Sequence, residues 1–325
     1  VASGQGPLIV MVHGFPDYSG SWDHLTPKLN DAYRVVAMDT RGYNLSDKPE
    51  GVDNYKMPKL VEDIQAVIKA EGVAKATVLG HDWGAIQAWY YAFAHPETLE
   101  RLIIMSVPHP ALFGRQISQS PENSNYARNF QKEGSEKNLT AEGLTRSVKD
   151  PADKAKYIEA FNRSSFASMM NYYRANYPDA PKPGEAPPSF PKIDVPTLVI
   201  HGMKDTALLS FGHNDTWDQI TKDTTMLMIP DSGHFIQRDA PDLLAAQIRS
   251  WLEENAERPR GLRGLFSRPP APPSPVPALS SWPALPPPAL STAPFGNVTK
   301  VSPPSVPAVP RLLPGAPAPT EYVST

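Results

Sequence analysis

The segment Gly80-His81-Asp82-Trp83-Gly84 carries the clearest chemical pattern in the chain. A β-branched run precedes it and an amphipathic stretch follows it, so Asp82 is expected at a tight turn from a strand to a helix. Flanking glycines allow close backbone packing, and such a turn exposes one side chain beside the amides that begin the helix. The pattern indicates a nucleophile at Asp82. The alternative is that Asp82 is only the N-cap of the helix.

An aspartate in this turn suits a different reaction from the usual serine. A serine must lose a proton and is suited to acyl carbons, whereas an ionised carboxylate can displace a leaving group from a saturated carbon. The intermediate would be an alkyl ester of Asp82. Its hydrolysis requires a base that activates water and hydrogen-bond donors for the oxyanion.

His234 and Asp205 are expected to complete the catalytic group. Each follows an expected strand, and the chain order of nucleophile, acid and histidine is the order in which this kind of sheet presents them. His234 is therefore expected to act as the base and Asp205 to orient it. The alternative for Asp205 is a turn-forming role. Asp215 and Asp218 fall in an expected helix farther along and are expected to be solvated.

A second turn, His13-Gly14-Phe15-Pro16, follows the first expected strand. A backbone N–H from Phe15, together with that of Trp83 after the nucleophile, would form a two-donor oxyanion hole. His13 is expected to be a structural turn residue and not a base. We also expect His13, Pro16 and Trp83 to shape the binding site.

The elements that must position these residues follow an α/β pattern. Short β-branched runs alternate with amphipathic stretches, which predicts a mostly parallel sheet flanked by helices. Strands are expected at 8–12, 33–38, 76–79, 101–105, 197–200 and 225–229, and helices at 57–71, 85–95 and 241–254. Residues 108–192 hold no expected strand and are too long for an ordinary crossover, so they are expected to form an inserted helical lid. The core then comprises residues 1–107 and 193–258.

Residues 259–325 differ in composition from the rest of the chain. They hold 19 of the 38 prolines, a density that excludes helix and central strand and predicts a disordered tail. Five basic residues and one acidic residue give this tail a charge of +4, which leaves −7 for residues 1–258 of a chain with −3 overall. An acidic body argues against a nucleic-acid-binding domain. Pro-x-x-Pro segments could recruit aromatic-groove domains, but disorder is the favoured interpretation, and the tail's partners are unknown.

Other classes of protein are excluded by what the sequence lacks. The absence of cysteine excludes disulfides, thiolate metal sites and cysteine nucleophiles. No apolar run approaches the roughly 20 residues that span a bilayer, and we expect neither a metal nor a cofactor. The chain begins with Val1, so an upstream targeting signal would not be visible, and a cytoplasmic location is only the default expectation.

Taken together, the turns at 13–16 and 80–84, Asp205 and His234 resemble the α/β-hydrolase fold, and specifically its epoxide hydrolase branch. The resemblance covers residues 7 to about 255. It implies that a small-molecule epoxide and water react to give a vicinal diol without a cofactor. The family normally has two more strands before the His-Gly-x-Pro turn. Because only six residues precede Pro7 here, an edge hairpin is expected to be missing.

The resemblance also implies two lid tyrosines that hydrogen-bond the epoxide oxygen and supply a proton as the ring opens. Residues 126–131 match the family's Tyr-x-x-x-Phe-Gln pattern, and Asn171-Tyr172-Tyr173-Arg174 matches the second pattern. Tyr126 and Tyr173 are therefore the expected donors. An alkoxide is a poor leaving group, which a phenol can protonate. Tyr172 competes with Tyr173 for this role, and packing within the lid is the alternative for both donors.

Two other functions are alternatives. A haloalkane dehalogenase resembles this chain in fold and nucleophile, but typically binds halide with Trp83 plus an Asn after His-Gly or a lid tryptophan. Here Phe15 stands at the Asn position and residues 108–192 contain no tryptophan. A fluoroacetate-type enzyme would favour Arg in place of Trp83. A non-catalytic ligand-binding homologue would be expected to lack the nucleophile, acid or base, and none is missing.

Overall fold

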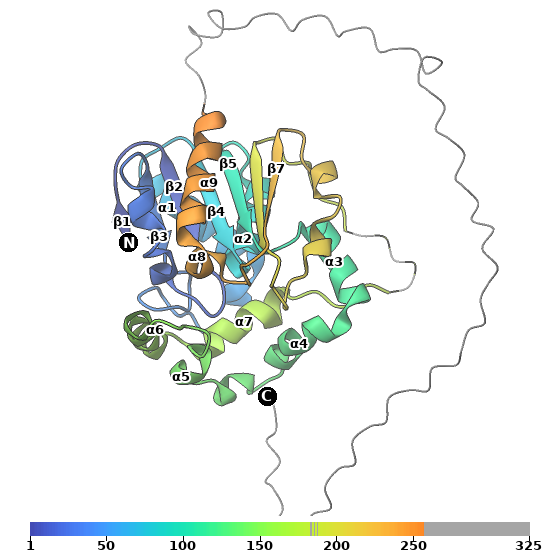
Figure 1. Ribbon diagram of the computed structural model, residues 1–325. Helices are drawn as coiled ribbons and strands as arrows, with labels where there is room; N and C mark the ends of the chain where they lie inside the picture. The colour runs from blue at the N-terminus through green and yellow to red at the C-terminus, as the bar shows by residue number, and fades with distance from the viewer. Residues whose placement is uncertain (183, 185, 187, 257–325) are drawn as a thin grey trace, which may run out of the picture. The chain divides into compact units, whose positions relative to one another are not determined.

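A seven-stranded sheet in the order β1-β3-β2-β4-β5-β6-β7 forms the centre of the molecule (Figure 1). The computed structural model describes residues 1–182, 184, 186 and 188–256. Strands β2 to β7 pair in parallel, and only β1 runs antiparallel to its neighbour. The mostly parallel α/β sheet predicted from the sequence is confirmed. Residues 259–325, expected to be disordered, lie outside the described residues.

The strand bounds agree with the sequence prediction to within two residues at each end, with one strand added. The strands are β1 (Ala2–Ser3), β2 (Leu8–Val12), β3 (Arg34–Met38), β4 (Ala76–His81), β5 (Leu99–Met105), β6 (Thr197–Gly202) and β7 (Thr224–Ile229). The addition is β1, which pairs Ala2 with Val36 of β3. The edge where a missing hairpin was expected therefore carries a short strand, which is too short to produce a detectable alternating pattern.

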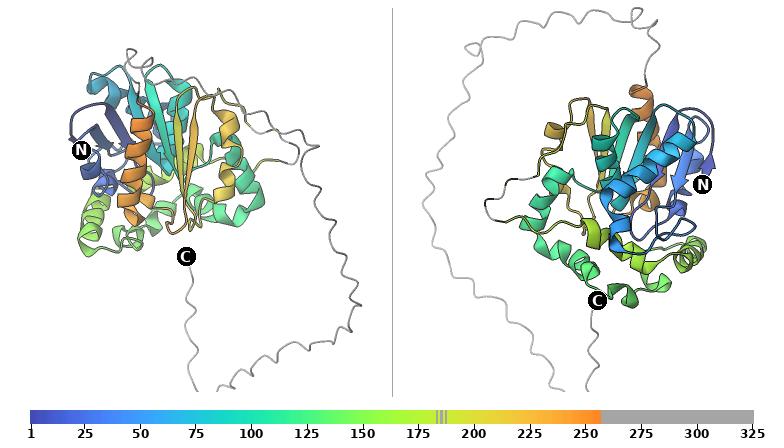
Figure 2. Two further views of the ribbon diagram at one scale, coloured as in Figure 1. Left: turned by 45° about the horizontal axis from the view of Figure 1, so that its top comes forward. Right: turned by 180° about the vertical axis from the view of Figure 1, so that it is seen from behind.

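Helices cover both faces of the sheet. Helices α1 (Met57–Ala70) and α2 (Trp83–Ala94) pack on one face, seen from behind in Figure 2, and α9 (Pro241–Glu254) packs on the other. The short α8 (Ile236–Asp239) precedes α9. Each face has its own buried apolar cluster. In α9 the helical spacing of Leu244, Ile248 and Trp251 places all three in the cluster, as the sequence predicted.

Among the described residues between β5 and β6, the chain forms five helices and several single turns. They are α3 (Pro110–Gln119), α4 (Asn125–Gln131), α5 (Ala141–Leu144), α6 (Pro151–Arg163) and α7 (Phe166–Asn176). We call residues 108–192 the cap. Figure 1 shows these helices gathered at one end of the sheet, and no strand occurs among the described residues of the cap. No helix in the described parts of the chain is long and apolar enough to cross a membrane.

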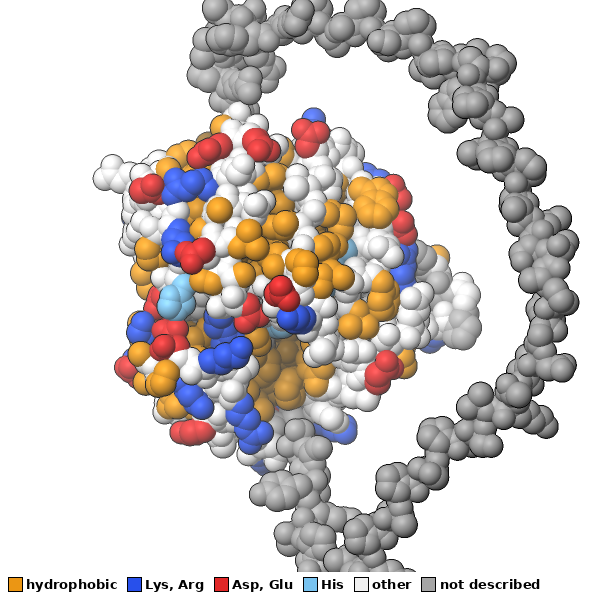
Figure 3. All heavy atoms as spheres, viewed as in Figure 1, with side chains coloured by type: hydrophobic (Ala, Val, Ile, Leu, Met, Phe, Trp, Pro, Cys, Tyr) orange, Lys and Arg blue, Asp and Glu red, His pale blue; other side chains and the backbone are white. Residues whose placement is uncertain are grey.

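The last strand is only partly covered. Leu227 of β7 is half-buried against the apolar cluster under α9, Met228 is 36% exposed, and Leu243 at the start of α9 is 44% exposed. Figure 3 shows hydrophobic side chains gathered on this face of the molecule. Two short 3-10 helices, at 210–213 and 216–219, take the place of a long helix between β6 and β7.

Candidate active site

Asp82 occupies a sharp turn between β4 and α2. Its backbone adopts φ 52°, a conformation that side chains other than glycine rarely adopt. The packing around the turn enforces it, because a Cβ on Gly84 would lie 2.0 Å from the carbonyl oxygen of Val12. A Cβ on Gly14 would lie 2.4 Å from Oδ1 of Asp82 itself. The side chain makes no capping hydrogen bond to α2, so the simple N-cap alternative does not describe it.

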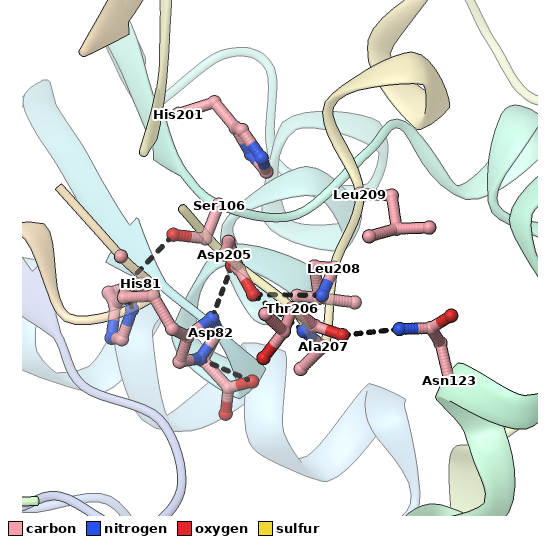
Figure 4. A network of polar contacts seen from close by, with 12 residues as sticks. His81, Asp82, Ser106, Asn123, His201, Asp205, Thr206, Ala207, Leu208 and Leu209 are labelled. Atoms are coloured by element: carbon pink, nitrogen blue, oxygen red, sulfur yellow. Dashed lines mark hydrogen bonds and ion pairs between the residues drawn. The ribbon is translucent and has the colours of Figure 1, made fainter. Parts of the chain in front are cut away.

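His234 lies between the carboxylates of Asp82 and Asp205, both of which are labelled in Figure 4. Nε2 of His234 is 3.4 Å from Oδ2 of Asp82, and Nδ1 of His234 is 2.7 Å from Oδ2 of Asp205. Their side chains are 15%, 12% and 0% exposed for His234, Asp82 and Asp205 respectively. The structure therefore brings together the three residues expected to form the catalytic group, with an imidazole between two shielded carboxylates.

The charges of the three groups stabilise one another. Burial alone would lower the pKa of His234, but hydrogen bonds to Asp205 and Asp82 outweigh burial and raise this pKa to about 10. Burial also opposes ionisation of both carboxyl groups, yet the hydrogen bond and charge of His234 lower the pKa of each. At neutral pH the resting site thus holds an ionised Asp82 and a protonated His234.

The second turn supplies a donor to the nucleophile. The backbone N–H of Phe15 donates to Oδ1 of Asp82 at 2.7 Å. The Phe15–Pro16 peptide bond is cis. Trp83 is the first residue of α2, so its amide belongs to the first turn of the helix, where N–H groups have no partner within the helix. Oδ1 is held by the backbone, while Oδ2 faces His234.

His13 and Pro16 do not border the cavity beside Asp82, although a part in the binding site was expected of both. His13 is fully buried, with Nδ1 2.9 Å from the carbonyl oxygen of Gly14 and Nε2 accepting the Thr40 N–H at 3.1 Å. Both ring nitrogens are thus bound to the backbone, which is the structural arrangement expected of His13. Of the three residues expected to shape the binding site, only Trp83 borders this cavity.

The cavity lies between the core and the cap. Apart from Asp82, its lining is aromatic and aliphatic, and it comprises Asp82, Trp83, Ile86, Val107, Phe113, Tyr126, Tyr173, Tyr177 and Leu208. An apolar lining with few polar groups has the composition that is typical of a small-molecule site. The structure thus places both expected tyrosine donors around the same space as the expected nucleophile.

Tyr126 of α4 and Tyr173 of α7 are neighbours, with ring centroids 6.2 Å apart. Burial raises the pKa of each well above its ordinary value, and the negative charge of Asp82 raises it further. Both phenols therefore keep their protons at neutral pH and are available as donors. The competing Tyr172 donates its hydroxyl to the carbonyl of Arg41 at 2.8 Å and does not line the cavity.

A buried polar network beside the histidine was not predicted. Nε2 of His81 lies 2.8 Å from the carbonyl oxygen of His234, and Nδ1 of His81 lies 3.2 Å from Nε2 of Gln237. Gln237 donates to Asp17 at 3.0 Å, and Asp17 also accepts the hydroxyl of Tyr157, in α6 of the cap, at 2.6 Å. In the sequence, only the positions of His81 in the turn at 80–84 and of Asp17 after the turn at 13–16 point to this network. No spacing rule links these two residues to Gln237 and Tyr157.

The two other aspartates considered from the sequence, Asp215 and Asp218, do not line the cavity beside Asp82. Asp215 pairs with Arg115 at 2.8 Å, and Asp218 is exposed, in a short 3-10 helix. In the described part of the chain, no three His, Cys, Asp or Glu side chains are placed to hold a metal ion.

Comparison with known proteins places the chain among hydrolases. The family described as alpha/beta hydrolase fold matches residues 7–241. The chain is 32% identical to Epoxide hydrolase 1 of Caenorhabditis elegans, in a match that covers 78% of this chain and 66% of that protein. It is also 32% identical to AB hydrolase superfamily protein YfhM of Bacillus subtilis (strain 168), covering 77% and 91% respectively. The solved structure of a Bacillus megaterium epoxide hydrolase in complex with an inhibitor is similar with a TM-score of 0.71 at 29% identity, covering 78% of this chain and 95% of that one.

Proposed function

This chain belongs to the α/β-hydrolase fold family, and we propose that it is an epoxide hydrolase working through an ester on Asp82. The enzyme adds water to a small-molecule epoxide and releases a vicinal diol. The observation that carries this proposal is the cavity that Asp82 shares with Tyr126 and Tyr173. A nucleophile facing two protonated phenols can attack an epoxide carbon while the epoxide oxygen receives a proton.

In the first step Oδ2 of Asp82 attacks an epoxide carbon. This oxygen is the one that the backbone does not hold, because Oδ1 accepts the Phe15 N–H; in the resting site it faces the protonated His234 at 3.4 Å. The carbon–oxygen bond of the ring breaks, and Tyr126 or Tyr173 gives its proton to the leaving oxygen, which becomes a hydroxyl. The products are an alkyl ester and a tyrosinate. Ester formation removes the charge of Asp82, so His234 loses one of the two carboxylates that hold its pKa high.

The tyrosinate then recovers its proton at the expense of the imidazolium, which leaves His234 neutral. In this state His234, oriented by Asp205 at 2.7 Å, can take a proton from water as the oxygen of that water attacks the ester carbonyl. The amides of Phe15 and Trp83 stabilise the oxyanion. When the ester bond breaks, the diol leaves, and the resting state returns with an ionised Asp82 and a protonated His234.

The cavity supports this reaction over the alternatives. A halide leaves without a proton, so a haloalkane dehalogenase has no use for two phenols beside the nucleophile. A non-catalytic binding protein has no need of an ionised Asp82 3.4 Å from His234.

A single turnover in heavy-oxygen water tests the covalent mechanism. The label should enter the carboxylate of Asp82, because water attacks the ester carbonyl and not the substrate carbon. Offered epoxides and 1-haloalkanes side by side, the enzyme should form diol and release little halide. Diol formation without label in Asp82 would refute the ester intermediate, and halide release in excess of diol would refute the substrate class.

A further inference from the structure

The loop that follows Asp205 wraps around its carboxylate. Oδ1 of Asp205 accepts the backbone N–H of Ala207 at 2.9 Å and of Leu208 at 3.0 Å, while Oδ2 binds His234 (Figure 4). The carboxylate is fully buried, so these bonds fix its orientation. The direction in which Asp205 holds the imidazole therefore depends on the shape of residues 206–209, which we call the acid loop.

Two amide side chains of the cap hold the acid loop. In α3, Nε2 of Gln116 donates to the carbonyl of Ala207 at 2.9 Å, and Oε1 of Gln116 accepts the Leu209 N–H at 2.8 Å. Asn123, in the turn after α3, donates to the carbonyl of Thr206 (Figure 4). The cap thus binds Thr206 and Leu209, which lie on either side of the two residues whose amides bind Asp205.

Gln116 is fixed in this position by packing. It is 1% exposed, and both polar atoms of its amide are hydrogen-bonded to the acid loop. The side chain therefore has little freedom to turn away. A substitution that removes both of its hydrogen bonds would leave a carbonyl and an amide of the acid loop without these partners, and the loop would have to rearrange.

We propose that Gln116 is a positioning residue for the second half of the reaction. This inference rests on the proposed ester mechanism. Ring opening needs an ionised Asp82 and a phenol. Leu208 of the acid loop lines their cavity, but among the described residues no hydrogen bond joins the acid loop to Asp82, Tyr126 or Tyr173. Ester hydrolysis needs a correctly oriented His234. Once Asp82 is esterified, the ion pair between Asp82 and His234 no longer exists, and Asp205 is the carboxylate that remains bound to the imidazole.

The test separates the two half-reactions by rapid quench and intact mass. Gln116→Leu has nearly the same size and no polar group, and it should leave the rate of Asp82 alkylation unchanged within about threefold. It should slow hydrolysis of the ester by about 10- to 100-fold, the range for loss of hydrogen bonds to partly buried groups. The alkylated enzyme should then accumulate during turnover to a larger fraction than in the natural protein.

Gln116→Glu gives a second measurement that a merely structural role would not produce. A protonated carboxyl can donate to the Ala207 carbonyl and accept the Leu209 N–H, as the amide does, whereas an ionised carboxylate cannot donate. The rate of ester hydrolysis in this variant should match the natural protein at low pH and fall as the new carboxyl ionises. The natural protein has no group at this position that titrates in this way.

Arg115→Ala is the matched control. Arg115 is adjacent in α3 and also joins the cap to the segment after the acid loop, through Asn214 and Asp215. Its hydrogen bonds go to these two residues and not to residues 206–209, so its loss should leave both half-reactions unchanged. Circular dichroism checks that the Gln116→Leu variant folds. If it does not fold, the pH dependence of ester hydrolysis in Gln116→Glu tests the role of Gln116 by itself.

The outcomes distinguish the inference from the proposed function. If the natural protein turns over without ever forming an ester on Asp82, the proposed function fails first. If the ester forms but Gln116→Leu hydrolyses it at the natural rate, slows both steps equally, or behaves like Arg115→Ala, the role of Gln116 is refuted while the function stands. A rate of ester hydrolysis in Gln116→Glu that keeps a constant ratio to the natural rate at every pH would refute it as well.

Discussion

Replacing Asp82 by asparagine should lower the pKa of His234. The side chain keeps its shape but loses its charge, which resembles the change that ester formation brings about in the proposed reaction. In the natural protein the pKa of His234 is raised from 6.5 to about 10 by two carboxylates acting against burial. Asp82→Asn removes one of them and leaves Asp205 in place.

The distance sets the size of the effect. Two charges 3.4 Å apart interact by about 5 kcal/mol at an effective dielectric constant of about 20, and by about 1 kcal/mol in bulk water. One pKa unit corresponds to about 1.4 kcal/mol. The pKa of His234 should therefore fall by between about 1 and 3.5 units. Starting from about 10, the larger of these falls brings the pKa of His234 near neutral pH, where the neutral imidazole can act as a base once Asp82 has lost its charge.

The ring nitrogens of His234 report its protonation directly in a nitrogen-15 NMR titration, with intact mass used to verify that residue 82 is still an amide. Asp231→Asn is the control, because Asp231 lies three residues before His234 in the sequence but its side chain is 92% exposed. Surface charges are screened by solvent, so the control should leave the titration unchanged. A pKa in Asp82→Asn within a few tenths of the natural value would refute the reasoning.

The same shift predicts how stability depends on pH. Because the pKa of His234 is higher in the folded protein than in the unfolded chain, its contribution to the free energy of unfolding is complete below pH 6.5. That contribution is lost as the pH rises towards about 10. Urea unfolding across this interval should show a smaller loss for Asp82→Asn than for the natural protein.

Two further predictions follow from the cavity and the turn. Tyr126→Phe and Tyr173→Phe should each slow alkylation of Asp82 by about 10²- to 10⁴-fold, the usual contribution of general acid catalysis, in a quenched single turnover. Tyr172→Phe, whose hydroxyl binds a core carbonyl, should leave this rate unchanged, and equal rates for all three variants would contradict the assignment. Gly84→Ala should lower the free energy of unfolding by about 1–3 kcal/mol or more, because the added methyl group would lie 2.0 Å from a backbone oxygen. Urea unfolding measures this change, and a urea midpoint equal to that of the natural protein would contradict the close packing.

The parts of the site that the sequence predicted obey local rules. Asp82 could be found because a strand, a helix and two glycines surround it within a few residues. At Gly84 a side chain would indeed have no room, because a Cβ there would lie 2.0 Å from the carbonyl oxygen of Val12. His234 and Asp205 could be found because parallel strands end at the same edge of a sheet, so residues that follow two strands come together. Each prediction needed only the order of the elements and the chemistry of the side chains.

The parts that were missed depend on contacts between distant positions. Asp17 and Tyr157 are 140 residues apart, and Gln116 and Ala207 are 91 apart. A buried glutamine in an amphipathic helix carries no signal of its own, since the same residue type is common on exposed faces. Its partners are backbone groups, which every residue possesses. Only the packing of α3 against the acid loop identifies Gln116.

These contacts change how the cap should be understood. On the proposed mechanism it supplies Tyr126 and Tyr173 to the leaving oxygen and Gln116 to the loop around Asp205. It also supplies Tyr157 to the buried network that ends at the carbonyl of His234. The cap therefore contacts the surroundings of the nucleophile, the acid and the base separately. Substitutions in the cap should change the rates of ring opening and of ester hydrolysis independently, according to which of these contacts they remove.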